Sequence, residues 1–125
     1  MKQTVLSDGE WKLMNLLWDH SPRTIGELVE ALKDDTGWSK TTIFVMLKRM
    51  IEKEIVRMDG SKRCQEYYPV LERESAARCE TQNFLSKVYQ GSIGMMVSSM
   101  TSRKELSREE IEELYQIIRD AREKE

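Results

Sequence analysis

Trp38-Ser-Lys-Thr-Thr-Ile-Phe-Val-Met-Leu-Lys-Arg-Met-Ile-Glu-Lys53 is the stretch that decides the fold. Apolar side chains recur along it at helical spacing, which predicts a single helix. Ser39 is a suitable N-cap, because its hydroxyl can accept a hydrogen bond from a free amide of the first turn. One face of the predicted helix carries four apolar residues that would pack on a core: Ile43, Met46, Leu47 and Met50.

The opposite face of this helix is unusual for a surface in water, because Phe44 and Val45 lie there beside hydroxyl groups and cations. Apolar groups can contact thymine methyls in the major groove, while Lys and Arg can reach guanine or phosphate. The pattern fits a helix that reads DNA, and it also fits a core helix buried on both sides. The first interpretation predicts these DNA-binding residues: Ser39, Lys40, Thr41, Thr42, Val45, Lys48 and Arg49.

Charge is distributed unevenly along the 125 residues, whose formal net charge is −2. Residues 38–63 hold seven Lys/Arg against three Asp/Glu, a local charge of +4, whereas residues 1–37 hold four against seven, a charge of −3. One basic region on an otherwise acidic protein supports local contact with phosphates and argues against a general polyanion binder.

Two capped helices are predicted before the central one. Ser7–Glu10 and Thr24–Glu27 both have the pattern of a capping box. The first helix should end near His20, because Pro22 cannot continue it, and the second should stop around Asp35–Gly37. Two helices, a tight turn and a third helix have the order of a helix-turn-helix, although any three-helix bundle would share it.

A β-hairpin is predicted next. Ile55–Met58 and Cys64–Tyr68 are β-prone, and the turn between them, Asp59–Arg63, begins with the Asp-Gly hairpin signal. Three helices followed by a hairpin with a basic tip describe a winged helix. Lys62 and Arg63 at the tip would then contact the DNA backbone.

The second half of the chain predicts a helical unit. We expect a long helix from Glu72 to about Tyr89, a break at Gly91-Ser92, a short helix, and a last helix capped by Ser107–Glu110. A unit this small is marginally stable alone, so its apolar stripes are best covered by a second copy of the chain. A Met-rich groove for peptides is the other interpretation. The predicted dimerisation residues are Phe84, Leu85, Val88, Ile93, Met96, Val97, Met100, Ile111, Leu114 and Ile118.

Several classes of protein find no support in the sequence. No run approaches the roughly 18 apolar residues of a membrane span, and no signal peptide is evident, which predicts a cytoplasmic protein. Cys64 and Cys79 do not make a disulfide framework and should be reduced thiols. No catalytic motif and no Cys/His cluster around His20 is found, so we expect neither an enzyme nor a metal or cofactor site.

A family resemblance rests on a set of residues spread over nearly the whole chain. They are Leu6-Ser7, Glu10-Trp11, Leu16, Trp18, Thr24, Glu27-Leu28, Trp38-Ser39, Thr42, Leu47, Arg49, Lys53, Tyr67-Tyr68-Pro69 and Leu106–Ile111. With these residues the sequence resembles the penicillinase repressor (BlaI/MecI) family of bacterial winged-helix transcriptional regulators. The resemblance implies a homodimeric repressor on a palindromic operator of genes for β-lactam resistance. It also implies control by a membrane-bound sensor metalloprotease.

The resemblance further implies a cleavage site just before the last helix, near Ser99-Met100. The bond typical of the family joins Asn to Phe, and these positions hold Ser and Met. Copper-responsive repressors of the family carry paired cysteines at the C-terminus, and the tail Arg119–Glu125 has none.

The sequence therefore predicts a mainly α protein with a small hairpin wing, divided into a winged-helix DNA-binding domain, 1–70, and a helical dimerisation domain, 71–125. Its predicted partners are double-stranded operator DNA, a second copy of itself and, by the resemblance, the sensor protease. Two alternatives stay open. One is a winged-helix protein-interaction module that docks through Phe44 and Val45 without DNA, and the other is a repressor of the same family that answers a different signal.

Overall fold

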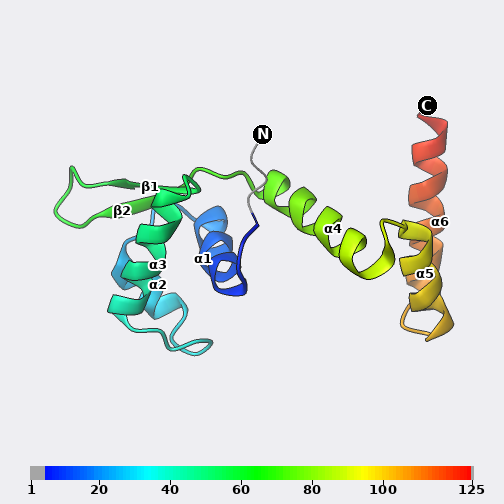
Figure 1. Ribbon diagram of the computed structural model, residues 1–125, viewed down its shortest axis with the longest axis horizontal. Coiled ribbons are helices and arrows are strands. Elements are labelled where there is room, and N and C mark those ends of the chain that lie inside the picture. Colours follow the sequence, from blue (N-terminus) through cyan, green and yellow to red (C-terminus); the bar gives the residue numbers. More distant parts are fainter. Residues whose placement is uncertain (1–4, 125) are drawn as a thin grey trace. The chain divides into compact units, whose positions relative to one another are not determined.

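A computed structural model describes residues 5–124, so residues 1–4 and 125, the outer ends of the two predicted domains, lie outside it. The chain is mostly helical with one two-stranded hairpin, which confirms the predicted fold class (Figure 1). The elements are α1 (Asp8–Asp19), α2 (Ile25–Ala31), α3 (Lys40–Glu52), β1 (Val56–Asp59), β2 (Glu66–Pro69), α4 (Arg73–Tyr89), α5 (Ile93–Ser102) and α6 (Arg108–Glu123). They form two compact units, of which the first ends at Thr81 and the second begins at Gln82.

Short-range capping sets the start of most helices, as predicted. Ser7, Thr24 and Ser107 each accept a hydrogen bond from the amide three residues on, and the carboxylate of the Glu at that position accepts one from the cap residue's own amide. Ser39 caps α3 in the same way without the returning carboxylate. None of the described helices is long and apolar enough to cross a membrane.

Helix α2 is shorter than the sequence predicted, because it ends at Ala31 and not near Asp35–Gly37. The amides of Thr36 and Gly37 both donate to the carbonyl of Leu32, at 3.0 and 2.9 Å, and close a turn there. Gly37 has a φ of +64°, a left-handed conformation that a glycine adopts without strain. This turn sends the chain into α3.

The core of the first unit is built mainly from α1, α2 and α3, with contributions from β1, β2 and α4. The inward face of α3 packs there as predicted, with Ile43, Leu47 and Met50 fully buried, whereas Met46 is only partly buried. The largest fully buried side chains are Leu13, Met14, Leu17, Leu28, Ile43, Leu47, Met50 and Ile55. Because this apolar face of α3 is packed on the core, the opposite face of the helix is directed toward solvent.

The hairpin is antiparallel, with Val56 opposite Pro69 and Asp59 opposite Glu66. Its loop therefore runs over residues 60–65, longer than the predicted turn, and β2 begins two residues later than expected. The carboxylate of Asp59 accepts a hydrogen bond from the amide of Ser61 at 2.9 Å, which starts the loop with a local side-chain bond in place of a two-residue turn.

The segment between β2 and α4 is hydrogen-bonded to the rest of the first unit. The amides of Val70 and Leu71 both donate to the carbonyl of Ile55, at 2.8 and 3.1 Å. The indole Nε1 of Trp18 donates to the carbonyl of Leu71 at 2.9 Å, and Ala76 in α4 is buried in the same core. The first turn of α4 thus belongs to the packing of the winged helix.

The second unit exposes most of its apolar side chains. Of its described residues, 82–124, only Leu85 is buried. Ile93 on α5 and Ile118 on α6 are 61% and 66% exposed. Gln90 and Gly91 have φ of 49° and 85°, which ends α4 and separates it from α5. A single chain leaves these apolar stripes uncovered.

An ion pair joins the start of α1 to the end of α3. Lys53 Nζ lies 2.8 and 2.9 Å from the two carboxylate oxygens of Glu10, whose Oε1 also accepts from the Ser7 amide at 2.9 Å. Burial raises the pKa of Glu10, but the hydrogen bonds from Lys53 and Ser7 outweigh it and hold the pKa below its ordinary value. The ionised form of Glu10 is therefore favoured by folding.

We expect Glu10→Gln to lower the free energy of unfolding by about 1–2 kcal/mol at pH 7, because it removes a charge-assisted hydrogen bond. A lowered folded pKa contributes stability above the unfolded value, about 4.3, and this contribution is lost as the pH falls through the folded value. The variant should consequently lose less stability than the wild type between pH 6 and pH 3. Urea unfolding at several pH values measures both effects.

Glu30→Gln is the matched control, because Glu30 is an exposed carboxylate on α2 without an ion pair to any described residue. Equal pH dependence in the two variants would contradict the role assigned to Glu10.

Candidate nucleic-acid interface

The outer face of α3 is exposed. Thr41, Thr42, Lys48 and Arg49 all lie at the surface, and Phe44 and Val45 are 45% and 46% exposed. The interpretation of α3 as a core helix buried on both sides is therefore wrong. The face offers hydroxyls, apolar groups and cations to solvent, the mixture that suits contact with base edges and phosphates.

Ser39 and Thr42 form the cap at the start of α3. Ser39 Oγ accepts from the Thr42 amide at 3.1 Å and donates to Thr42 Oγ1 at 3.0 Å. Both hydroxyl groups are thus engaged in shaping the helix start. Lys40 and Thr41 follow directly in the first turn, where the free amides of a helix N-terminus favour a phosphate.

A cleft of about 410 Å³ brings two predicted DNA-binding residues together. Lys40 at the start of α3 and Arg63 in the hairpin loop both line it, although 23 positions separate them in sequence. The cleft is also lined by Thr24, Ile25, Gly26, Cys64 and Gln65. The structure therefore places α3 and the wing loop beside one common hollow.

Three of the seven cations in residues 38–63 are held by contacts within the chain. Lys53 pairs with Glu10 at 2.8 Å, and Lys62 lies 3.2 Å from the carboxylate of Glu66. Arg57 lies over the ring of Tyr68, 3.9 Å from its centroid.

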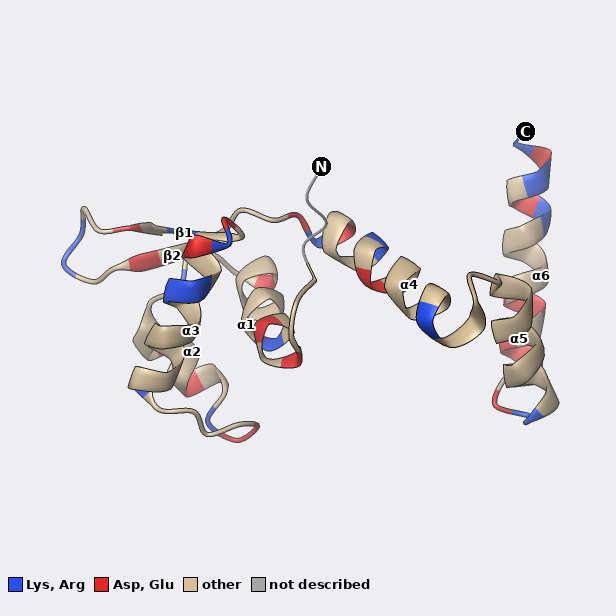
Figure 2. Ribbon diagram, viewed as in Figure 1, with Lys and Arg blue, Asp and Glu red and all other residues tan. Residues whose placement is uncertain are grey.

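The other four cations of this segment are exposed and form no ion pair with any residue between 5 and 124. They are Lys40, Lys48, Arg49 and Arg63. Figure 2 shows Lys and Arg in blue on α3 and on the loop that joins β1 to β2. These four are the cations that are free to neutralise phosphates.

Arg57 is a wing residue that the sequence did not single out. It lies directly opposite Tyr68 in the hairpin register, and this pairing places its guanidinium on the aromatic ring. The strand register would have revealed the contact between Arg57 and Tyr68. The sequence placed the start of β2 two residues too early, so this register was not predicted.

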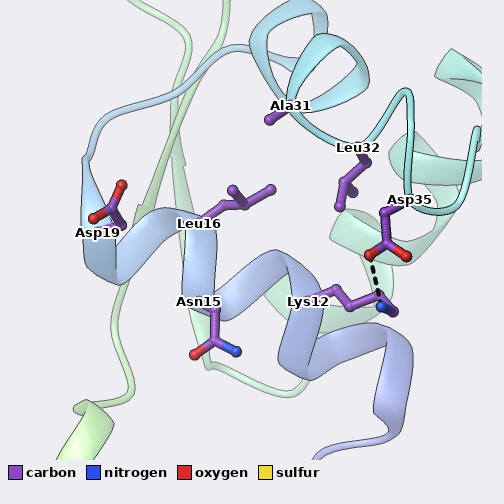
Figure 3. A pocket seen from close by; sticks show the side chains of 7 residues that line it. All are labelled: Lys12, Asn15, Leu16, Asp19, Ala31, Leu32 and Asp35. Carbon is purple, nitrogen blue, oxygen red and sulfur yellow. Dashed lines mark hydrogen bonds and ion pairs between the residues drawn. The ribbon is translucent and has the colours of Figure 1, made fainter.

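A second hollow, of about 490 Å³, lies between α1 and α2 and contains none of the predicted DNA-binding residues (Figure 3). Lys12 Nζ and Asp35 Oδ2 form an ion pair across it at 2.7 Å. Asp19 adds a further carboxylate to its lining. With one cation already paired and two carboxylates, this hollow is unfavourable for a phosphate.

The predicted dimerisation residues lie in the second unit, mostly at its surface. Leu85 is buried. Met96, Val97, Met100 and Leu114 are partly buried. The remaining predicted residues, Phe84, Val88, Ile93, Ile111 and Ile118, are exposed.

The predicted cleavage site lies inside α5. Ser99 and Met100 are partly buried in its last turns. The carbonyl of Ser99 accepts from the Arg103 amide at 3.3 Å, and the carbonyl of Met100 accepts from the Glu105 amide at 3.0 Å. Both carbonyls of the predicted site are therefore engaged in hydrogen bonds at the end of α5.

Among the described residues no group of three or more His, Cys, Asp or Glu could hold a metal ion. Cys64 is exposed in the wing loop and Cys79 is partly buried in α4, and neither forms a disulfide.

Comparisons with known proteins agree over most of the chain. A family model described as "Penicillinase repressor" matches residues 6–120. The penicillinase repressor of Bacillus licheniformis is 32% identical over 115 residues, which cover 92% of this chain and 90% of the relative. The methicillin resistance regulatory protein MecI of Mammaliicoccus sciuri is 27% identical over 113 residues, 90% of this chain and 92% of the relative.

Two solved structures resemble part of the chain. One is the solution structure of the DNA-binding domain of the repressor BlaI, with a TM-score of 0.52 and 30% identity. The other is monomeric Bacillus licheniformis BlaI in complex with the blaP half-operator, with a TM-score of 0.51 and 30% identity. Each match covers 59% of this chain and 90% of the solved chain.

Proposed function

Because the chain belongs to the penicillinase repressor family, we propose that it is a transcriptional repressor, not an enzyme, that binds a specific operator in double-stranded DNA. The exposed outer face of α3 carries this proposal, since Phe44, Val45 and Lys48 face solvent from a helix whose other side packs on the core. The likeness to a repressor domain bound to a half-operator supports it.

The reading residues in this proposal come from α3 and the wing. Lys40, Thr41, Thr42, Val45, Lys48 and Arg49 contact the major groove and its flanking phosphates. Arg63 contacts the backbone from the hairpin loop, Lys62 lies beside it in the same loop, and Ser39 holds the start of α3 in place. Arg63 and Lys40 line one cleft, which supports contacts from helix and wing to the same stretch of the DNA backbone.

The repressor acts as a homodimer on an inverted repeat. The uncovered apolar stripes of α5 and α6 support this step, because a second copy would bury Ile93 and Ile118. One winged helix offers few base contacts, and two on a common dimer unit add their contacts across two half-sites. Targets among genes for β-lactam resistance follow from the names of the relatives.

Derepression follows from cleavage near Ser99-Met100 by a sensor protease, which separates α6 from the rest of the chain. Loss of the dimer then removes the gain from two half-sites. Because both flanking carbonyls are hydrogen-bonded in or just after α5, unwinding of this helix end is the step that controls cleavage.

The test is selection of bound sequences from a randomised DNA pool by the full chain at two salt concentrations. We expect an inverted repeat with half-sites about one helical turn or a multiple apart. The four unpaired cations of residues 38–63, and hence eight in a dimer, give a slope of log affinity against log salt of about −7, since each neutralised phosphate contributes about −0.9.

Selection of no sequence at either salt concentration would reject the repressor. The second candidate, docking of a protein partner through Phe44 and Val45, is favoured by the exposure of both side chains. An apolar contact of that kind would show little dependence on salt, which separates the two functions.

A further inference from the structure

The wing contains an ion pair at the point where the repressor would meet the DNA backbone. Lys62 Nζ in the hairpin loop lies 3.2 Å from Oε1 of Glu66, the first residue of β2. The side chain of Glu66 is 18% exposed, whereas that of Lys62 is 67% exposed. The carboxylate is therefore the more buried partner and the ammonium group the more exposed one.

In this structure the ammonium group of Lys62 compensates the negative charge of Glu66. Oε1 of Glu66 is buried, and no described residue gives it a hydrogen bond. A buried carboxylate oxygen without a partner is costly, so the pair with Lys62 is favoured. The carboxylate of Glu66 in turn raises the pKa of Lys62 above its ordinary value.

A second carboxylate stands beside the same cation. Asp59 lies directly opposite Glu66 in the hairpin register, and its charge also acts on Lys62. Arg63, the next residue, is exposed and has no ion pair with a described residue. The two neighbouring cations of the wing thus differ in their availability to an incoming phosphate.

We propose that Glu66 holds Lys62 as an internally compensated cation, weakens the grip of the wing on the DNA backbone, and leaves Arg63 as its effective phosphate contact. This inference rests on the proposed function and deepens it. A phosphate that approaches Lys62 must compete with a carboxylate already in place. Binding to the phosphate would also leave the buried oxygen of Glu66 uncompensated.

The test is a double-mutant cycle in the full chain with Glu66→Gln, Lys62→Met and both changes together. Affinity is measured on the selected operator and on an unrelated duplex over a range of salt. Glu66→Gln should tighten binding to both DNAs by about eightfold per wing at 0.1 M salt and steepen the salt slope by about 0.9 per wing, the contribution of one further phosphate contact.

Lys62→Met should change DNA affinity by less than about twofold in the wild type. In the Glu66→Gln background the same change should lower DNA affinity by about eightfold per wing, which removes the whole gain. The control for net charge is Glu52→Gln on α3. It changes the charge equally, and Glu52 is exposed and makes no ion pair with a described residue. Circular dichroism verifies that each variant is folded.

The inference is overturned if Glu66→Gln tightens DNA binding no more than Glu52→Gln does. It is also overturned if Lys62→Met lowers DNA affinity as much in the wild type as in the Glu66→Gln background. Either result leaves the repressor standing if the unchanged protein selects an operator, whereas absence of DNA binding by the unchanged protein rejects both.

Discussion

Leu47→Ala is expected to lower the free energy of unfolding of the first unit by about 2–5 kcal/mol. Leu47 is completely buried, in the middle of α3 and against the shared core, so the change leaves a cavity. Small domains have only about 5–15 kcal/mol in total, and the variant should lose operator binding because α3 no longer holds its position. The three tryptophans of the chain, Trp11, Trp18 and Trp38, all lie in the first unit. Urea unfolding followed by tryptophan fluorescence therefore reports on this unit alone.

Val45→Ala is the matched control on the opposite face of the same helix. Val45 is 46% exposed, so its truncation should change stability by less than about 0.5 kcal/mol. Operator affinity should fall all the same, because the side chain is assigned to the groove. If both variants lost similar stability, the division of α3 into a core face and a reading face would be refuted.

Ile118→Glu is expected to abolish the proposed dimer and leave a monomer. Ile118 is 66% exposed in the single chain, so a charge there does not disturb the chain itself, whereas burial of that charge in a dimer interface would be costly. Affinity for the full inverted repeat should fall by about 100-fold or more, because the second half-site no longer adds to the first. Sedimentation gives the oligomeric state, and titration of full and half operators gives the affinities.

Gln116→Glu is the matched control, because Gln116 lies two positions before Ile118 and therefore about 200° from it around the axis of α6. It adds the same charge and should leave the dimer intact. Half-site affinity should be unchanged in Ile118→Glu, since α3 is not altered. A variant that sedimented as a dimer would show that this stripe is not the interface.

Local signals made α3 and the helix starts predictable. Three capping boxes and the N-cap Ser39 lie within four residues of the amides that they satisfy, so the sequence alone reveals them. The inward face of α3 follows from the 3.6-residue period. The resemblance to the penicillinase repressor family is confirmed by the match over residues 6–120.

Long-range pairing was out of reach of the same reasoning. Glu10 and Lys53 lie 43 positions apart, and nothing in either segment announces their contact. In the hairpin, Tyr67 of β2 pairs with the distant Arg23, and the chain just after β2 is hydrogen-bonded to the carbonyl of Ile55. The sequence shows neither contact, so the start of β2 and the pair between Lys62 and Glu66 were not predicted. The sequence thus predicted where positive charge gathers, but not which cations the fold had already engaged.

The contacts between the start of α4 and the winged helix determine where the chain can be truncated to give a folded fragment. A recombinant fragment that stopped at Val70 would lack the carbonyl of Leu71, and the indole of Trp18 would lose its acceptor. It would also lack Ala76, which closes the core. We infer that the smallest autonomous DNA-binding fragment extends through the first turns of α4, to about Thr81, where the first unit ends.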